Sequence, residues 1–103
     1  MAAAFVKRAK FVATVTPDGR TLVRDPRTTP AWHDLSTVEN YPGNVVGVSL
    51  ANTGPDLDVV VRNADGRIAH AVCTVWPEPG DDDDDTPAWP DNCEAFWDLT
   101  PPN

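Results

Sequence analysis

Two stretches of the chain carry the apolar pattern of β-strands. In residues 57–62, alternation puts Leu57, Val59 and Val61 on one face and the even-numbered residues on the other. Residues 11–15 are a second apolar stretch, rich in valine and threonine. We therefore expect a strand in each place.

Each stretch runs into a four-residue turn that ends in Asp-Gly. The first turn is Thr16-Pro17-Asp18-Gly19 and the second is Asn63-Ala64-Asp65-Gly66. Proline suits the second position of a type I turn, and glycine takes the left-handed position that closes the turn as a bulge. The pattern predicts two hairpins, whose returning strands cover residues 20–24 and 67–76.

The rest of the chain adds a few short elements. The apolar residues in 45–50 indicate a further strand, which a turn at 52–55 follows. The short segment 93–99, which contains two aromatic residues, indicates a last strand. Only the alanine-rich start could be helical. We predict an all-β fold of five or six mostly antiparallel strands, a small antiparallel sandwich or barrel built on the two hairpins. One domain would cover residues 1–103, with a basic N-terminal arm at 1–10 and an acidic, proline-rich loop at 77–92.

The two hairpins could be one repeat seen twice. Their Asp-Gly-Arg turns, at 18–20 and 65–67, are 47 residues apart. An aromatic-x-Asp-Leu segment follows each, at 32–35 and 96–99, with a spacing of 64 residues, which implies a 17-residue insertion in the second copy. A period near 47 is typical of a four-stranded propeller blade. The alternative fold is therefore two propeller blades, completed by oligomerisation.

A simpler explanation remains open, because Asp-Gly turns recur in many β proteins. A competing internal match joins Thr-Pro-Ala-Trp at residues 29–32 to the same four residues at 86–89, and its offset differs from that of the hairpins.

Residues 54–70 resemble the blade motif of bacterial fucose-binding β-propeller lectins. In both, a Leu-Asp-Val strand enters an Arg-x-x-Asp-Gly turn, and a histidine, here His70, lies in the next strand. Residues 32–35 resemble the segment that precedes this motif. The resemblance implies a propeller that binds sugar, and some members carry two blades per chain and close the ring by oligomerising. The chain departs from the motif at Ser36-Thr37, where Gly-Gly is usual, and at Ala69, where an aromatic is usual.

Charge divides the chain into two unlike parts. The total is −8, but residues 1–27 hold six cations and two acids, a net +4, while residues 28–103 carry −12. Such a chain can meet a copy of itself head to tail. Its acidic surface disfavours nucleic acid as a partner. The candidate contacts between copies are the basic residues Lys7, Arg8 and Lys10 and the acidic run Asp81, Asp82, Asp83, Asp84 and Asp85.

The acidic run itself is expected to be a solvated loop, because five adjacent carboxylates repel one another. Calcium binding would need carboxylates at alternating positions with a glycine at the bend, and Gly80 lies outside the run.

Cys73 and Cys93 are the two cysteines of the chain. A disulfide between them would stabilise the fold by roughly 3 kcal/mol. We expect free thiols because the N-terminus lacks the order of charges typical of a signal peptide, and the disulfide remains the alternative. A zinc site with His33 and His70 is not expected, because His70 and Cys73 would point to opposite faces of one strand. No metal or other cofactor is predicted.

No catalytic motif is recognisable, so we expect a non-catalytic protein. The favoured function is a structural or assembly module that packs with copies of itself or with a larger protein assembly, such as a small surface or connector component of a virus-like particle. The alternative is a carbohydrate-binding two-blade propeller lectin, in which Trp32, Trp76 and Trp97 would contact sugar.

The expected cellular location rests on two sequence signals that are not recognisable, a membrane-spanning segment and a signal peptide. No apolar run is long enough to span a membrane, so no membrane partner is expected. Without a signal peptide, the protein would be cytoplasmic on synthesis, and release as part of a particle is the alternative.

Overall fold

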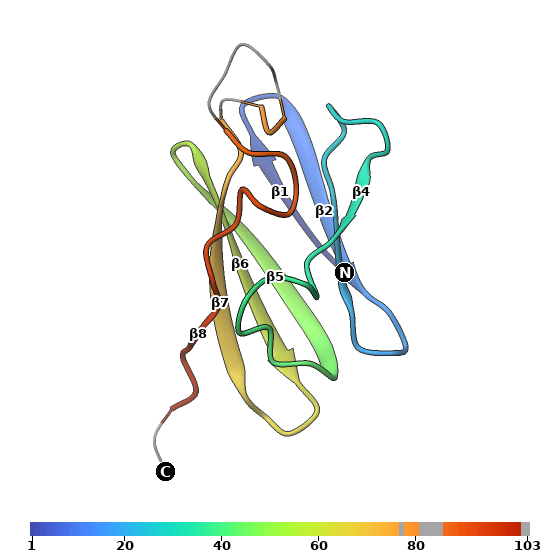
Figure 1. The fold of residues 1–103 in the computed structure, drawn as a ribbon, viewed down its shortest axis with the longest axis vertical. Helices are drawn as coiled ribbons and strands as arrows, with labels where there is room; N and C mark the ends of the chain where they lie inside the picture. Colours follow the sequence, from blue (N-terminus) through green and yellow to red (C-terminus); the bar gives the residue numbers. More distant parts are fainter. Residues whose placement is uncertain (77, 81–85, 102–103) are drawn as a thin grey trace.

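The structure, a computed structural model, describes residues 1–76, 78–80 and 86–101. These residues form eight strands and no helix, arranged as two four-stranded antiparallel sheets that pack together (Figure 1). The predicted all-β antiparallel fold is therefore confirmed, as a small sandwich. Sheet 1 consists of β1 (Ala2–Val6), β2 (Ala9–Val15), β3 (Thr21–Arg24) and β4 (Trp32–Asp34), and sheet 2 of β5 (Val45–Thr53), β6 (Asp56–Asn63), β7 (Ile68–Thr74) and β8 (Trp97–Asp98), each in that order across the sheet.

Both predicted hairpins are present, as β2–β3 and β6–β7. Gly19 and Gly66 take the expected left-handed conformation, with φ of 84° and 87°. The two turns are closed in the same way. The amide of Thr16 donates to the carbonyl of Arg20 at 2.9 Å, and the amide of Asn63 donates to that of Arg67 at 3.0 Å.

The alanine-rich start is a strand, so the possibility of a helix there was wrong. Residues Ala2–Val6 form β1, which pairs with β2 so that Ala4 lies opposite the buried Phe11. Helix propensity in so short a segment is weak, and pairing with a neighbouring strand overrides it. Val6 pairs with Ala9 across a two-residue turn, and Lys7 in that turn has a φ of 54°. Most of residues 1–10, which were predicted to be a basic arm, therefore belong to the β1–β2 hairpin of sheet 1.

Each sheet ends in a short edge strand. β4 has three residues that were not expected to form a strand, and β8 has only two of the aromatic residues 93–99. β5 continues to Thr53, three residues further than expected. Short edges limit the unpaired backbone that a sheet offers to other chains.

The core lies between the two sheets. Phe11 and Val23 of sheet 1 are fully buried there, as are Leu57, Val59 and Val61 of sheet 2. Burying such side chains is the main source of stability in a domain of this size.

No helix of the described residues is long and apolar enough to cross a membrane.

The two sheets are related by the predicted repeat. Ala13 pairs with Val23 in sheet 1, and the residues 47 positions later, Val60 and His70, pair in sheet 2. The same offset relates the pairing of β1 with β2 to that of β5 with β6. Three strands of each sheet are thus equivalent position by position.

The fourth strands are equivalent with the predicted offset of 64. Arg20 after the first turn contacts Asp34 of β4 at 3.2 Å, and Arg67 contacts Asp98 of β8 at 3.5 Å. Each aspartate also accepts a hydrogen bond of 2.8 Å from the amide two residues later. These local contacts occur in both copies, so the internal repeat extends to the edge strands.

Cys73 and Cys93 form a disulfide, so the expectation of free thiols was wrong. Cys73 is in β7, and Cys93 forms an isolated bridge beside it. The bond closes the long β7–β8 connection, which contains the insertion, against the sheet. In the described part of the chain no cysteine is free.

Candidate functional site

The sheets pack against each other through unlike faces. We call the side of each sheet that faces the other sheet its inner face, and the opposite side its outer face. Ala13 and Val23 are fully buried on the inner face of sheet 1. Their equivalents Val60 and His70 lie on the outer face of sheet 2, where both are partly exposed.

The reverse relation holds for the other pair of faces. Val59 and Ala71 are fully buried on the inner face of sheet 2. Their equivalents Val12 and Arg24 lie on the partly exposed outer face of sheet 1. The intrachain contact is therefore head to tail, and each sheet leaves free the face that its repeat partner uses for packing.

The two outer faces retain large apolar side chains. On sheet 1, 62% of Phe5 and 43% of Trp32 are exposed. On sheet 2, 42% of Trp97 is exposed, and Trp97 packs edge-on against His70, with ring centroids 4.3 Å apart. Phe5 and Trp32 belong to the two opposite edge strands of sheet 1, so exposed apolar side chains border that face on both sides.

The outer face of each sheet carries charged residues of both signs, including Asp34 on sheet 1 and Arg62 on sheet 2. The outer face of sheet 1 carries Lys10 and Arg24, neither of which has an ion-pair partner among the described residues. On the outer face of sheet 2, Asp58 lies 3.6 Å from Nε2 of His70, and Arg62 is exposed nearby in β6. Nε2 of His70 is buried and makes no hydrogen bond within the described structure.

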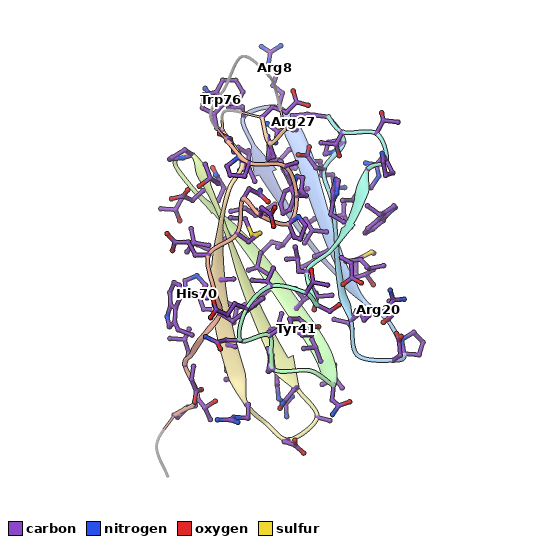
Figure 2. The ribbon with its side chains drawn as sticks, in the orientation of Figure 1. Arg8, Arg20, Arg27, Tyr41, His70 and Trp76 are labelled. Atoms are coloured by element: carbon purple, nitrogen blue, oxygen red, sulfur yellow. A yellow bond between two sulfur atoms is a disulfide. The ribbon has the colours of Figure 1, made fainter. Side chains whose placement is uncertain are left out.

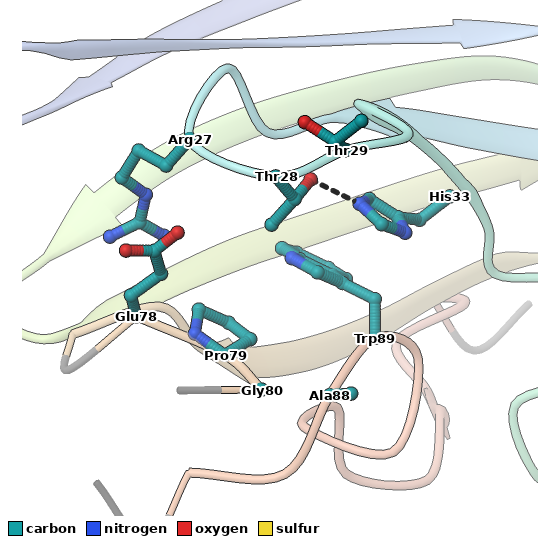
Figure 3. Close-up of a pocket in the computed structure, with 9 residues that line it drawn as sticks. All are labelled: Arg27, Thr28, Thr29, His33, Glu78, Pro79, Gly80, Ala88 and Trp89. Atoms are coloured by element: carbon teal, nitrogen blue, oxygen red, sulfur yellow. Dashed lines mark hydrogen bonds between the residues drawn. The ribbon is translucent and has the colours of Figure 1, made fainter. Parts of the chain in front are cut away.

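A cavity of about 400 Å³ lies between the β3–β4 loop and the β7–β8 connection (Figure 3). The imidazole of His33 stacks on the indole of Trp89 with centroids 5.3 Å apart and planes 14° apart. Oγ1 of Thr28 lies 2.7 Å from Nε2 of His33. We call this the inter-sheet pocket; its lining is Arg27, Thr28, Thr29, His33, Glu78, Pro79, Gly80, Ala88 and Trp89.

Asp25 holds one wall of this pocket. Its fully buried carboxylate accepts hydrogen bonds of 2.9 Å from both Nε and Nη2 of Arg27, and one of 3.1 Å from Nε1 of Trp89. Burial raises the pKa of Asp25, but the hydrogen bonds from Arg27 and Trp89 outweigh it and leave that pKa below its ordinary value. The carboxylate thus stays charged and fixes both neighbours.

His33 is affected differently. Burial lowers its pKa below 6.5, and the nearby charge of Asp25 offsets this only in part. The imidazole is therefore neutral at pH 7, which suits its stacking on Trp89.

A second hollow, of about 580 Å³, lies beside the β1–β2 turn. Nζ of Lys7 lies 4.2 Å from the ring centroid of Trp76, of which 46% is exposed. Arg8, Arg27 and Trp76 gather at one end of the molecule, away from Arg20 (Figure 2). We call this the basic groove; its lining is Val6, Lys7, Arg8, Ala9, Pro26, Arg27 and Trp76.

The candidate contact residues are distributed among these features. Lys7 and Arg8 line the basic groove, whereas Lys10 lies on the outer face of sheet 1. The run Asp81 to Asp85 is outside the described residues; on either side of it, the amide of Gly80 donates to the carbonyl of Thr86 at 3.1 Å.

The three tryptophans considered as sugar contacts are not brought together. Trp32 lies on the outer face of sheet 1, Trp97 on the outer face of sheet 2, and Trp76 in the basic groove. The tryptophan that lines the inter-sheet pocket is Trp89. The repeated Thr-Pro-Ala-Trp segments could have pointed to it, because residues of both, Thr29 and Ala88 to Trp89, line that pocket.

The histidines and cysteines are also separate. His33 is in β4 of sheet 1, His70 is in β7 of sheet 2, and both cysteines are in the disulfide. Among residues 1–76, 78–80 and 86–101, no group of three or more histidine, cysteine or acidic side chains is placed to hold a metal ion.

Comparisons with known proteins add no relative. No family model matches the chain, and no significant match was found among curated proteins or solved structures.

Proposed function

We propose that this protein is an assembly subunit that stacks head to tail with copies of itself. The outer face of sheet 1 in one copy receives the outer face of sheet 2 from the next, which repeats the contact already made inside the chain. The observation that carries the proposal is the packing of the two equivalent sheets through unlike faces, which leaves one face of each kind unused.

A head-to-tail contact generates a closed ring when its rotation closes, and a filament when it does not. Two four-stranded units per chain, related by a repeat, are also what a two-blade propeller subunit requires. We therefore favour a closed ring in which the sheets are blades. Such a ring presents flat ends, which suits a surface or connector component of a larger particle.

Charge supports the choice of a second copy as the partner. Inside the chain, Leu57 and Ala71 lie on the inner face of sheet 2. Their repeat equivalents on the outer face of sheet 1 are the cations Lys10 and Arg24. Sheet 2 offers Asp58 at the position of Phe11. The same face of sheet 2 also carries Arg62 at the position of Val15, so its charges are mixed. The support comes from Asp58, which is of opposite sign to Lys10 and Arg24 on the facing sheet.

Light scattering coupled to gel filtration tests the proposal. The natural protein should elute as an oligomer of defined mass. Leu22→Asp on the outer face of sheet 1, or Val60→Asp on that of sheet 2, should each give a monomer, because a buried unpaired charge is costly. Ala64→Asp, in the exposed β6–β7 turn, is the matched control and should leave the mass unchanged.

Mixing the two variants separates this contact from general stickiness. Each variant keeps one natural face, so an equimolar mixture of Leu22→Asp and Val60→Asp should form a heterodimer and nothing larger. A monomeric natural protein, at moderate concentration and at low salt, would contradict the proposal. So would a symmetric dimer that both variants retain.

A second candidate function is sugar binding in the inter-sheet pocket. Its support is the combination of the indole of Trp89 with polar side chains, Arg27 and Glu78, in a cavity of about 400 Å³. Sugar sites typically combine an aromatic wall with a few polar groups. A fucose titration followed by tryptophan fluorescence tests it. Saturation that Trp89→Phe weakens would support this function, and no response at millimolar sugar would contradict it.

A further inference from the structure

We propose that the basic groove binds a sugar ring that carries a carboxylate, such as a uronic acid residue of an acidic polysaccharide. This ligand differs from the neutral sugar considered for the inter-sheet pocket. The lining residues all come from one chain and lie at one end of the molecule, apart from the outer faces of the sheets. The site therefore does not depend on self-assembly.

The groove has an apolar wall that is open to solvent. The indole of Trp76 remains 46% exposed beside Val6, Ala9 and Pro26. A half-exposed indole offers a flat surface on which the C–H face of a sugar ring can pack. Exposed tryptophans also contribute strongly to binding where they occur at contact sites.

Two of its cations come from the β1–β2 turn. Val6 pairs with Ala9, so Lys7 and Arg8 are the two residues of a tight turn and their positions are fixed by the hairpin. In the part of the chain that the structure describes, no carboxylate lies within 4.0 Å of either. Neither charge is therefore neutralised by an acid of the described residues, and the ammonium of Lys7 lies over the indole of Trp76.

The third cation is held in place by a buried acid. Nε and Nη2 of Arg27 donate to Asp25, and its guanidinium carbon lies 5.1 Å from the ring centroid of Phe11. Nη1 makes no hydrogen bond within the described residues. A guanidinium fixed in this way loses little side-chain entropy when it binds a carboxylate.

The combination favours an acidic sugar over an acidic peptide. A uronate presents a rigid apolar ring face and a carboxylate on the same ring, which matches Trp76 beside Arg8 and Arg27. The side chains of aspartate and glutamate are flexible and offer no such face. The net charge of −8 repels polyanions from most of the surface, so saturable binding of an acidic ligand would point to this groove.

Calorimetric titration with tetragalacturonate, at low ionic strength, tests the inference. We expect one site per chain, and neutral galactotetraose should not bind measurably. Arg8→Gln and Trp76→Ala should each weaken binding about tenfold, as expected when one important contact is lost. Arg67→Gln is the matched control, since it removes one positive charge next to the β6–β7 turn, at the opposite end of the molecule (Figure 1), and should leave the affinity within twofold.

Three outcomes would overturn it: no binding of tetragalacturonate, equal binding of the neutral tetrasaccharide, or an equal loss of affinity in Arg8→Gln and Arg67→Gln. Polyglutamate that binds as tightly, with no effect of Trp76→Ala, would indicate an acidic peptide site instead. Circular dichroism checks that each variant is folded. Repeating the titration on Val60→Asp, the variant designed to be monomeric, makes the result independent of self-assembly.

Discussion

The indole of Trp89 donates a hydrogen bond of 3.1 Å to the buried carboxylate of Asp25. Asp25 follows the third strand of sheet 1, and Trp89 belongs to the long connection before the last strand of sheet 2. The bond therefore joins the two sheets at the end where both candidate ligand sites lie. Asp25 also accepts hydrogen bonds from Arg27, which lines both sites. Its carboxylate therefore connects Arg27 to the β7–β8 connection, to which Trp89 belongs.

Removing this carboxylate should destabilise the protein more than removing its indole partner. Asp25→Ala leaves the guanidinium of Arg27 without its bidentate partner, and we expect a loss of about 3 kcal/mol in the free energy of unfolding. Trp89→Phe removes one hydrogen bond and part of the packing, so about 1–2 kcal/mol is expected. Urea unfolding measures both, and Asp65→Ala, in an exposed turn, should change stability by less than about 0.5 kcal/mol.

His33 should make the protein less stable in mild acid. Its pKa is lowered in the folded protein, so below pH 6.5 the unfolded chain binds the proton first. The contribution of neutral His33 to the free energy of unfolding should be fully present above about pH 7. It should be lost as the pH falls from 6.5 towards the lower pKa that His33 has in the folded protein. Thermal unfolding between pH 8 and 5 measures this decline, and His33→Gln should make it shallower. An unchanged slope in that variant would show that His33 is not responsible.

The disulfide should contribute substantially to stability. Because Cys73 and Cys93 are 20 residues apart, the chain-entropy model gives about 3 kcal/mol. A reducing agent should lower the melting temperature of the natural protein and have no effect on a variant in which both cysteines are alanine. Thiol titration of the unfolded, unreduced protein should find no free thiol. Two titratable thiols would contradict the bond.

Gly19 and Gly66 occupy equivalent turns but should tolerate alanine differently. Both have positive φ, so alanine at either costs about 1–2 kcal/mol for the left-handed conformation. At Gly66 a Cβ would meet no atom within 4 Å. At Gly19 it would lie 2.7 Å from the backbone Cα of Asn44, so the connection between the sheets must also shift. Urea unfolding should show the larger loss for Gly19→Ala.

Local turn chemistry made the two hairpins predictable. The residues of both Asp-Gly turns favour the geometry that both hairpins show. The spacing of the aromatic-x-Asp-Leu segments gave the correct offset of 64 residues between the edge strands, but residues 32–34 were not expected to form a strand. The alanine-rich start was misjudged because its structure is decided by pairing with β2, which local propensity does not report. Free thiols were expected because the N-terminus does not resemble a signal peptide. The sequence does not show that Cys73 and Cys93 lie side by side in the fold, where they form the disulfide.

The candidate ligand sites were harder to foresee. The inter-sheet pocket joins Arg27 and His33 to Glu78 and Trp89, which are more than 40 residues away in the sequence. Nothing local to either segment indicates that they meet. The basic residues at the start of the chain were conspicuous in the sequence, where they were predicted to contact another copy, but the tertiary fold alone places Trp76 beside Lys7.

The unlike faces of the two sheets have a consequence for how such a protein can evolve. A contact that joins a surface to its own copy by a twofold axis is satisfied by two partners, whereas a contact between unlike faces inside one chain leaves one face of each kind at the two ends of that chain. A gene duplication that adds another four-stranded unit would therefore lengthen the stack without a new type of contact. The number of units encoded in one polypeptide can change while the geometry of the contact is inherited intact.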